Sequence, residues 1–242
     1  MRRQVILISL LATCVALTVW ITNMDKIGVM EPFTYGVMLK ETQRHLWMVL
    51  IAEAVVILIG VPLGILVTRS GFKRLATPVV GGASAAQSIP SLAIVAIMIP
   101  LLGMGFWPAI VALSIWGLLP ILRNSYAAIN NINPAIVEAA RGMGMTKGQI
   151  ARRVELPLAV PVIMTGIRVS TVVVVGTATL AALIGAGGLG KIILAGVFCG
   201  EPLITLQGAA PTAALAITMG FTLECMESWM TPRGLKVKAE IS

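Results

Sequence analysis

The sequence predicts an all-α membrane protein with about six transmembrane helices. Hydrophobic residues make up 57% of the 242 residues, charged residues make up only 12%, and the mean hydropathy is +0.95. A soluble domain carries about a quarter charged residues, so much of the charge that covers a water-exposed surface is missing. Apolar runs of about 20 residues, the length that a helix needs to cross the hydrocarbon core, recur along the chain.

Six apolar segments, separated by short polar gaps, are candidates for these helices. Residues 1–22 are expected to form an N-terminal transmembrane anchor, with an apolar run over 5–22, and residues 23–44 an outer loop. Prolines inside the later runs are compatible with helices, because packed neighbours can satisfy the carbonyls that proline frees. The other candidate spans lie in a core of residues 45–230, before a tail of residues 231–242: 45–67, 75–102, 106–122, 158–184 and 203–230.

The distribution of basic residues predicts the orientation of these spans. Arg2 and Arg3 precede the first span, and basic clusters follow the second, fourth and sixth spans. The gaps between those clusters hold few basic residues or balance them with acids. Lysine and arginine accumulate in cytoplasmic loops, so both termini are expected in the cytoplasm. Residues 1–20 also resemble a signal peptide, but no small-x-small cleavage site follows, which favours a retained anchor.

Few side chains of this sequence are suited to catalysis, metal binding or disulfide formation. Cys14, Cys199 and Cys225 lie far apart, His45 is the only histidine, and Asp25 is the only aspartate. These spacings support neither a disulfide framework nor a metal site. The net charge of +8 is spread over the polar gaps instead of forming one patch, which argues against nucleic acid as a partner. We expect no catalytic residue, no cofactor and no metal in this chain.

The glycine-rich residues 185–192, GAGGLGKI, imitate a nucleotide-binding loop. A P-loop needs a serine or threonine after its lysine to hold magnesium, but Ile192 follows Lys191. A dinucleotide-binding turn needs an acidic residue about 20 positions further on, and none is present. The loop is therefore interpreted as a turn at the outer face, where glycines let the chain leave the membrane.

Residues 133–157 predict a short helical hairpin in the cytoplasm. Asn133 can cap a helix that starts with proline, and Gly144 can take the left-handed conformation that ends a helix. Residues 146–149, TKGQ, have the spacing of a capping box for a second helix over 147–155, which the following Leu-Pro pair is expected to end. By its local pattern alone the hairpin is a solvated loop or a DNA-binding helix-turn-helix.

The hairpin also resembles the EAA motif of ABC importer permeases. The matching residues are Glu138, Ala139 and Ala140, then Gly144, then Val154, Leu156 and Pro157, with Val154 at the position where the family usually has isoleucine. The resemblance extends over about residues 46–227. It implies a type I importer permease, with a five-helix core plus an N-terminal helix.

In that family the hairpin is the coupling helix, which sits in a groove of the ATPase subunit. The resemblance therefore implies that Glu138 and the Ala139–Ala140 face dock on the ATPase, and that Gly144 sets the angle between the two short helices. It also implies the partners of the complex in a bacterial inner membrane. These are two cytoplasmic ATPase subunits that bind ATP and magnesium, a second permease chain (identical or paralogous), and an extracytoplasmic substrate-binding protein.

Further stretches of the sequence are similar to permeases for osmoprotectants such as glycine betaine, carnitine and choline. These stretches are residues 87–92, 119–124, 176–182 and 184–190. A permease of the same architecture for another small solute, such as an amino acid, is the alternative. A channel is a weaker alternative, because it needs no dock for an ATPase. An intramembrane enzyme is also weaker, because it needs a base or metal ligands that converge within the bilayer, and the cysteines do not cluster near His45.

Polar residues within the spans are candidates for the translocation path, although hydrogen bonding between helices explains them equally well. They are Gln87, Ser88, Ser91, Asn124, Thr177 and Thr179. Glu53 is the one acidic residue well inside a span. An acid within the bilayer is costly, so it is a functional candidate by default, but it could equally face a polar group of another helix.

Overall fold

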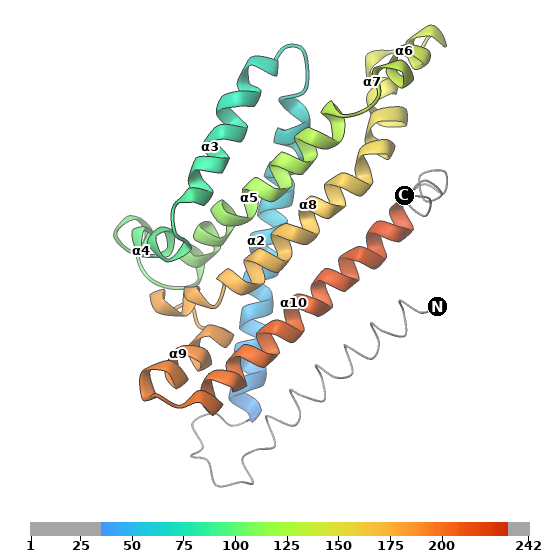
Figure 1. Ribbon diagram of the computed structural model, residues 1–242. Coiled ribbons are helices and arrows are strands. Elements are labelled where there is room, and N and C mark those ends of the chain that lie inside the picture. Colours follow the sequence, from blue (N-terminus) through green and yellow to red (C-terminus); the bar gives the residue numbers. More distant parts are fainter. Residues whose placement is uncertain (1–34, 232–242) are drawn as a thin grey trace.

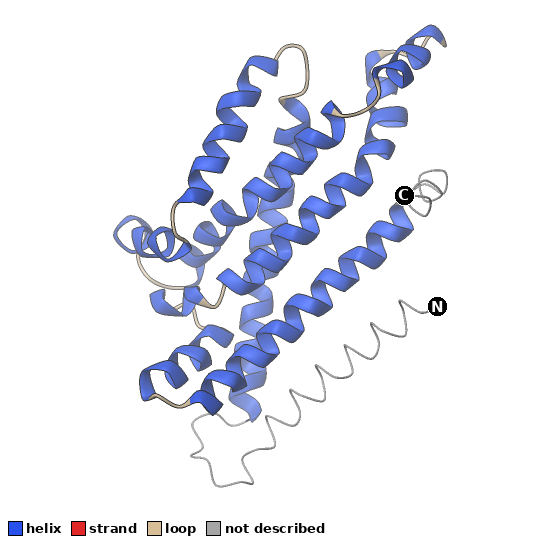
Figure 2. Cartoon of the chain, viewed as in Figure 1, coloured by secondary structure: helices blue, strands red, loops and turns tan. Residues whose placement is uncertain are grey.

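The computed structural model describes residues 35–231, in which all regular structure is helical (Figures 1 and 2). In this range four helices are long and apolar enough to cross a membrane, and a bent pair of helices gives a fifth candidate span. The predicted all-α membrane fold is confirmed for this range. The predicted first span, Cys14 and the tail lie outside it. The long helices are α2 (Tyr35–Leu66), α5 (Phe106–Asn130), α8 (Leu156–Thr177) and α10 (Pro202–Met230).

Helix α2 begins at Tyr35, well before the predicted start of the second span at residue 45. The second half of the predicted outer loop, 23–44, is therefore helical. This segment has a helical burial pattern in which Met38 and Glu41 are buried, whereas Lys40, Gln43 and Arg44 are exposed. The exposed polar face gave the segment the composition of a loop.

The predicted third span, 75–102, is not one helix. It forms α3 (Ala76–Ser88) and α4 (Ser91–Leu102), which meet at an angle of 96° (Figure 1). Ile89 is extended, and Pro90 occupies the cap position of α4. The residue before a proline is pushed out of the helical region, and proline has no N–H to continue the hydrogen-bond ladder. The run is apolar on both sides of Pro90 and holds other prolines that do not end a helix, such as Pro100 inside α4, so the sequence did not reveal the break.

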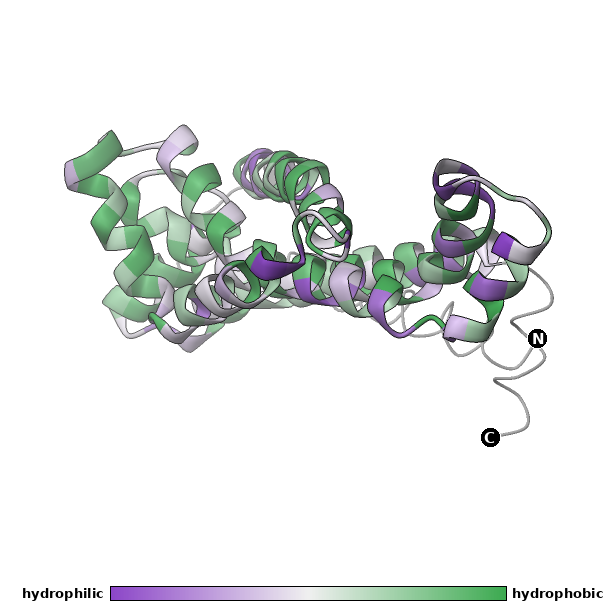
Figure 3. Cartoon of the chain, turned by 90° about the horizontal axis from the view of Figure 1, so that it is seen from above, coloured by the Kyte–Doolittle hydropathy of each residue, from purple (hydrophilic) through white to green (hydrophobic). Residues whose placement is uncertain are grey.

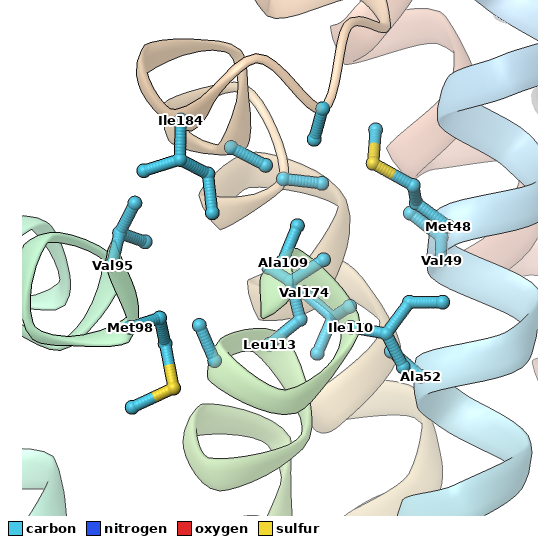
Figure 4. Packing of buried hydrophobic residues seen from close by; sticks show 14 of the residues in the cluster. Met48, Val49, Ala52, Val95, Met98, Ala109, Ile110, Leu113, Val174 and Ile184 are labelled. Atoms are coloured by element: carbon cyan, nitrogen blue, oxygen red, sulfur yellow. The ribbon is translucent and has the colours of Figure 1, made fainter. Parts of the chain in front are cut away.

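Side chains from five helical segments converge in the largest apolar cluster of the bundle (Figure 4). Helix α5 packs against α2 and α8, and α10 packs against α8 and α9 (Leu189–Cys199). Many large apolar side chains are exposed. Hydrophobic residues predominate along the helices of the bundle (Figure 3). Such a surface suits lipid as the surrounding solvent. The cluster includes Met48, Val95, Leu113, Val174 and Ile184.

Close helix contacts in the bundle depend on small residues. A Cβ atom at Gly64 of α2 would lie 2.7 Å from the carbonyl oxygen of Leu122 in α5. A Cβ atom at Gly166 of α8 would lie 2.6 Å from the Cβ atom of Asn124. Small residues allow such approaches in membranes, where van der Waals packing drives helix association.

The glycine-rich loop forms the predicted turn and packs against α2. Gly187 and Gly188 have φ values of 78° and 80°, which glycine adopts without strain. The N–H of Gly188 donates a hydrogen bond to Glu41 Oε2 over 2.7 Å, just before the N-terminus of α9. A carboxylate is favourable there, because the N–H groups of a first helical turn carry partial positive charge. Gly190 is tightly enclosed, since a Cβ atom there would lie 1.8 Å from the carbonyl oxygen of Thr179.

Candidate functional site

The first helix of the hairpin, α6 (Pro134–Gly142), begins as the sequence predicts. Asn133 Oδ1 accepts a hydrogen bond from the N–H of Ala135 over 3.0 Å, and Pro134 is the first helical residue. Proline suits this position, because its missing N–H would have no partner inside the helix. Figure 1 shows the hairpin at the end of the bundle opposite to α9.

The turn between the two short helices has the geometry of a Schellman motif. Gly144 has a φ of 80°, as predicted. Its N–H donates to the carbonyl oxygen of Arg141 over 2.9 Å, and the N–H of Met145 donates to that of Ala140 over 3.2 Å. These two bonds satisfy carbonyls that the end of α6 leaves unpaired. The predicted capping box over 146–149 is also present and starts α7 (Lys147–Ile150).

The second helix of the hairpin does not end at Leu156 and Pro157, contrary to the prediction. It continues through a π-helical segment, Ala151–Glu155, directly into α8. Proline in an α-helix clashes with the carbonyl four residues earlier. The wider π turn just before Pro157 relieves that clash, so the chain from Lys147 to Thr177 is one helical rod.

The exposed surface of the hairpin differs from the predicted docking face at one residue. Glu138 and Ala139 are exposed, but only 1% of Ala140 is exposed, because this residue lies on the inner side of α6. Two apolar side chains that the sequence reasoning missed are exposed instead: Met143 at 75% and Ile136 at 43%. Exposed apolar groups at a polar turn are typical of a protein contact.

The base of the hairpin is tied to the segment after α2. Arg69 forms an ion pair with Glu155, whose side chain is largely buried. The motif residues around it, Val154, Leu156 and Pro157, are half-buried in the rod. In the sequence Arg69 is only one of the basic residues that follow the second span, because a partner 86 residues away leaves no local signal.

Among the predicted path residues, Gln87 joins two helices. Its Nε2 donates a hydrogen bond to the carbonyl oxygen of Trp116 over 3.1 Å. This carbonyl lies four residues before Pro120, which lies inside α5 and has no N–H to donate to it. Gln87 on α3 therefore satisfies the group that the proline frees.

Four other path residues donate hydrogen bonds to carbonyls of their own chain segment. Asn124, for example, donates to the carbonyl oxygen of Pro120 over 2.8 Å. Ser91 is the first residue of α4 and is half-buried. No hydrogen bond within residues 35–231 joins two of the predicted path residues. The other three donors are Ser88, Thr177 and Thr179, which bond to the carbonyls of Ser84, Val173 and Gly176.

Glu53 faces polar groups of another helix and is 5% exposed. Ser170 Oγ lies 3.1 Å from Glu53 Oε2, and Thr171 Oγ1 lies 2.9 Å from Glu53 Oε1. Ser170 Oγ also lies 2.9 Å from the carbonyl oxygen of Gly117 in α5. The carboxyl group therefore sits where α2, α5 and α8 meet, and each of its oxygens has a hydroxyl partner.

Arg168 of α8 is a charged residue that the sequence reasoning missed. Its Nη1 lies 3.3 Å from Glu224 Oε2, and its Nη2 lies 3.8 Å from Glu227 Oε2, both on α10. Charged residues in spans usually pair with one another. An isolated arginine in a long apolar run is the signal that would have identified it.

Comparisons with known proteins agree with this architecture. Residues 60–233 match the family described as binding-protein-dependent transport system inner membrane component. The glycine betaine/carnitine/choline transport system permease protein OpuCB of Bacillus subtilis (strain 168) is 45% identical over 207 residues, covering 86% of this chain and 94% of that protein. The osmoprotectant import permease protein OsmW of Salmonella typhimurium is 42% identical over 206 residues, covering 83% and 95%.

A solved structure is similar as well. An inward-facing MetNI methionine ABC transporter contains a chain that is 26% identical, with a TM-score of 0.75 and coverage of 84% of this chain and 100% of that chain. The multi-pass inner-membrane location and the type I importer fold follow from these matches. Such permeases work with an ATPase and a substrate-binding protein. The chain therefore belongs to the family of binding-protein-dependent transport system inner membrane components, the permease subunits of ABC importers.

Proposed function

We propose that this chain is the permease of an ATP-driven importer for osmoprotectants such as glycine betaine, carnitine or choline. The names of relatives that are 45% and 42% identical support this substrate class. Because a similar solved structure is a methionine transporter, an amino acid is the alternative substrate. In this proposal two ATPase subunits, a second permease chain (identical or paralogous) and an extracytoplasmic binding protein complete the complex.

The functional proposal rests on the hairpin, because the exposed surface of α6 and of the following turn is suited to a protein contact. Ile136, Ala139 and Met143 follow one another at helical spacing, so they share one exposed and mainly apolar face, and Glu138 is an exposed charged residue next to Ala139 in the sequence. We assign this face to the ATPase groove, with Ala140 closing the hairpin from inside. The hairpin end and both termini are then cytoplasmic. ATP and magnesium bind the ATPase, and this chain contributes no catalytic residue.

The docking assignment is tested by one substitution in the turn and one in α6. Gly144→Val should strain a left-handed position by about 1–2 kcal/mol and change the angle of the hairpin. Glu138→Lys should reverse a charge at the contact. Both variants should insert into the membrane normally but lose substrate-stimulated ATP hydrolysis and uptake in the reconstituted complex.

The matched control is Gly142→Val, two residues earlier, where a Cβ atom meets nothing within 4 Å and φ is not positive. It should keep most of the coupled hydrolysis. Wild-type rates in both Gly144→Val and Glu138→Lys would contradict the assignment of the hairpin to the ATPase.

The polar groups of the spans favour a zwitterionic substrate. Both oxygens of Glu53, the acid deepest in the described spans, already have hydroxyl partners. A cation without a counter-charge in hydrocarbon costs several kcal/mol or more. Glycine betaine, whose charges compensate each other, should therefore be transported faster than choline.

Uptake of both labelled compounds by the complex, reconstituted with its own binding protein, tests this preference. Glu53→Gln should slow both substrates equally, because the carboxyl group holds helices together. Selective loss of choline uptake in this variant would instead make Glu53 a cation site. Preference for an amino acid would overturn the osmoprotectant assignment.

A further inference from the structure

A cavity of about 660 Å³ lies between the hairpin and the segment that follows α2. Its walls come from elements far apart in the sequence: residues 68–73 on one side and both short helices of the hairpin with Glu155 on the other. The ion pair between Arg69 and Glu155 spans the two sides. A molecule in this cavity would contact both the membrane bundle and the hairpin.

The lining of the cavity is strongly basic. Four of its residues are cationic, and Glu155 is the one acidic residue among them, already paired with Arg69. The cationic residues are Arg69, Lys73, Arg141 and Lys147. Concentrated charge of one sign in a concave surface raises the local concentration of counter-ions. The cavity therefore suits an anion with several oxygen acceptors.

Exposed apolar residues close to Lys73 in the sequence indicate where the anion comes from. Phe72 directly precedes Lys73 and is 44% exposed, and Leu75, two positions after it, is 49% exposed. Apolar side chains beside cationic ones are typical of the level where a membrane meets water. A soluble anion needs only the basic lining, whereas a lipid needs an apolar surface for its chains beside it.

We propose that this cavity binds the headgroup of an acidic phospholipid, with its phosphate between Lys73 and Arg141 and its acyl chains along Phe72 and Leu75. Basic pockets at the cytoplasmic ends of membrane helices bind anionic headgroups in this way. The site rests on the orientation proposed above. The bound lipid holds the hairpin to the end of α2, on the same side as the Arg69–Glu155 pair.

The experiment uses the assembled transporter in nanodiscs of phosphatidylcholine with a minority of phosphatidylglycerol. The double variant Lys73→Gln/Arg141→Gln removes two cavity cations. The matched control, Arg152→Gln/Arg153→Gln, removes two exposed cations of the hairpin that do not line the cavity. Native mass spectrometry measures the phosphatidylglycerol that stays bound after transfer to detergent.

Wild type and control should retain phosphatidylglycerol, and the cavity variant should bind it about fivefold more weakly for each cation removed. The charge-preserving variant Lys73→Arg/Arg141→Lys should restore binding. Equal retention in the cavity variant and the control would overturn the proposal. Wild-type binding of inorganic phosphate in pure phosphatidylcholine, with no preference for phosphatidylglycerol, would identify a soluble anion instead. Loss of the ATPase subunits from the cavity variant, with lipid retention unchanged, would assign the cavity to the ATPase.

Discussion

Trp116 has a backbone carbonyl that its own helix cannot satisfy, because Pro120 has no N–H. Gln87 satisfies it from α3 over 3.1 Å. Gln87→Leu should therefore lower the stability of the permease by about 1–2 kcal/mol, the upper range for a hydrogen bond between membrane helices. Thermal unfolding of the purified protein, followed by the loss of its monodisperse peak, measures the change.

A double-mutant cycle isolates this contribution. In a Pro120→Ala background the N–H of the alanine can donate to the same carbonyl. Gln87→Leu should therefore lower the stability of the permease much less in that background. Equal costs in both backgrounds would show that Gln87 does not act through the freed carbonyl.

At the residue scale the sequence predicts local contacts well and distant ones poorly. The caps at Asn133, Gly144 and 146–149 follow from residues a few positions apart, and all three are present. The partners of Glu53 lie 117 and 118 residues away. Nothing in the neighbourhood of Glu53 distinguishes a structural contact from a site in the path.

At the scale of elements, α8 and α10 are joined by the ion pairs of Arg168 with Glu224 and Glu227. Arg168→Gln leaves the two carboxylates without a counter-charge. The pairs are partly exposed, so the expected loss is about 1 kcal/mol or less. This corresponds to a fall of about 2–4 °C in the melting temperature.

Arg123→Gln is the matched control for this substitution, because Arg123 is an exposed arginine of the neighbouring helix α5. It should leave the melting temperature unchanged. Glu224→Gln/Glu227→Gln in the Arg168→Gln background should recover part of the loss. If Arg168→Gln melts like the control, the ion pairs do not hold the two helices together.

Some prolines interrupt helices of this protein and others do not, and the sequence alone could not distinguish the two cases. Pro90 breaks the third predicted span, and Pro157 does not end the hairpin. Pro120 and Pro161 lie inside continuous helices. The outcome depends on whether a π turn or a neighbouring helix accommodates the missing N–H, and that is decided by packing.

For the whole molecule, the proposed orientation places the two ends of the bundle in different compartments. Helix α9 lies opposite to the hairpin (Figure 1). Cys199 is the exposed last residue of α9, and Cys225 lies within α10, inside the predicted sixth span, 203–230. A membrane-impermeant maleimide added to intact cells should label Cys199 and not Cys225. Cys199→Ser should abolish that labelling, whereas Cys225→Ser should not. Labelling of Cys225 alone in folded protein would reverse the orientation.

The uninterrupted helix from Lys147 to Thr177 makes the hairpin one end of a lever. Its 31 residues span about 46 Å, so a tilt of about five degrees at the hairpin would carry the far end by about 4 Å. That far end lies two residues before Thr179, whose carbonyl leaves no room for a Cβ atom at Gly190. A tilt that a partner imposes on the hairpin at one end of the bundle would therefore displace the glycine turn at the other end.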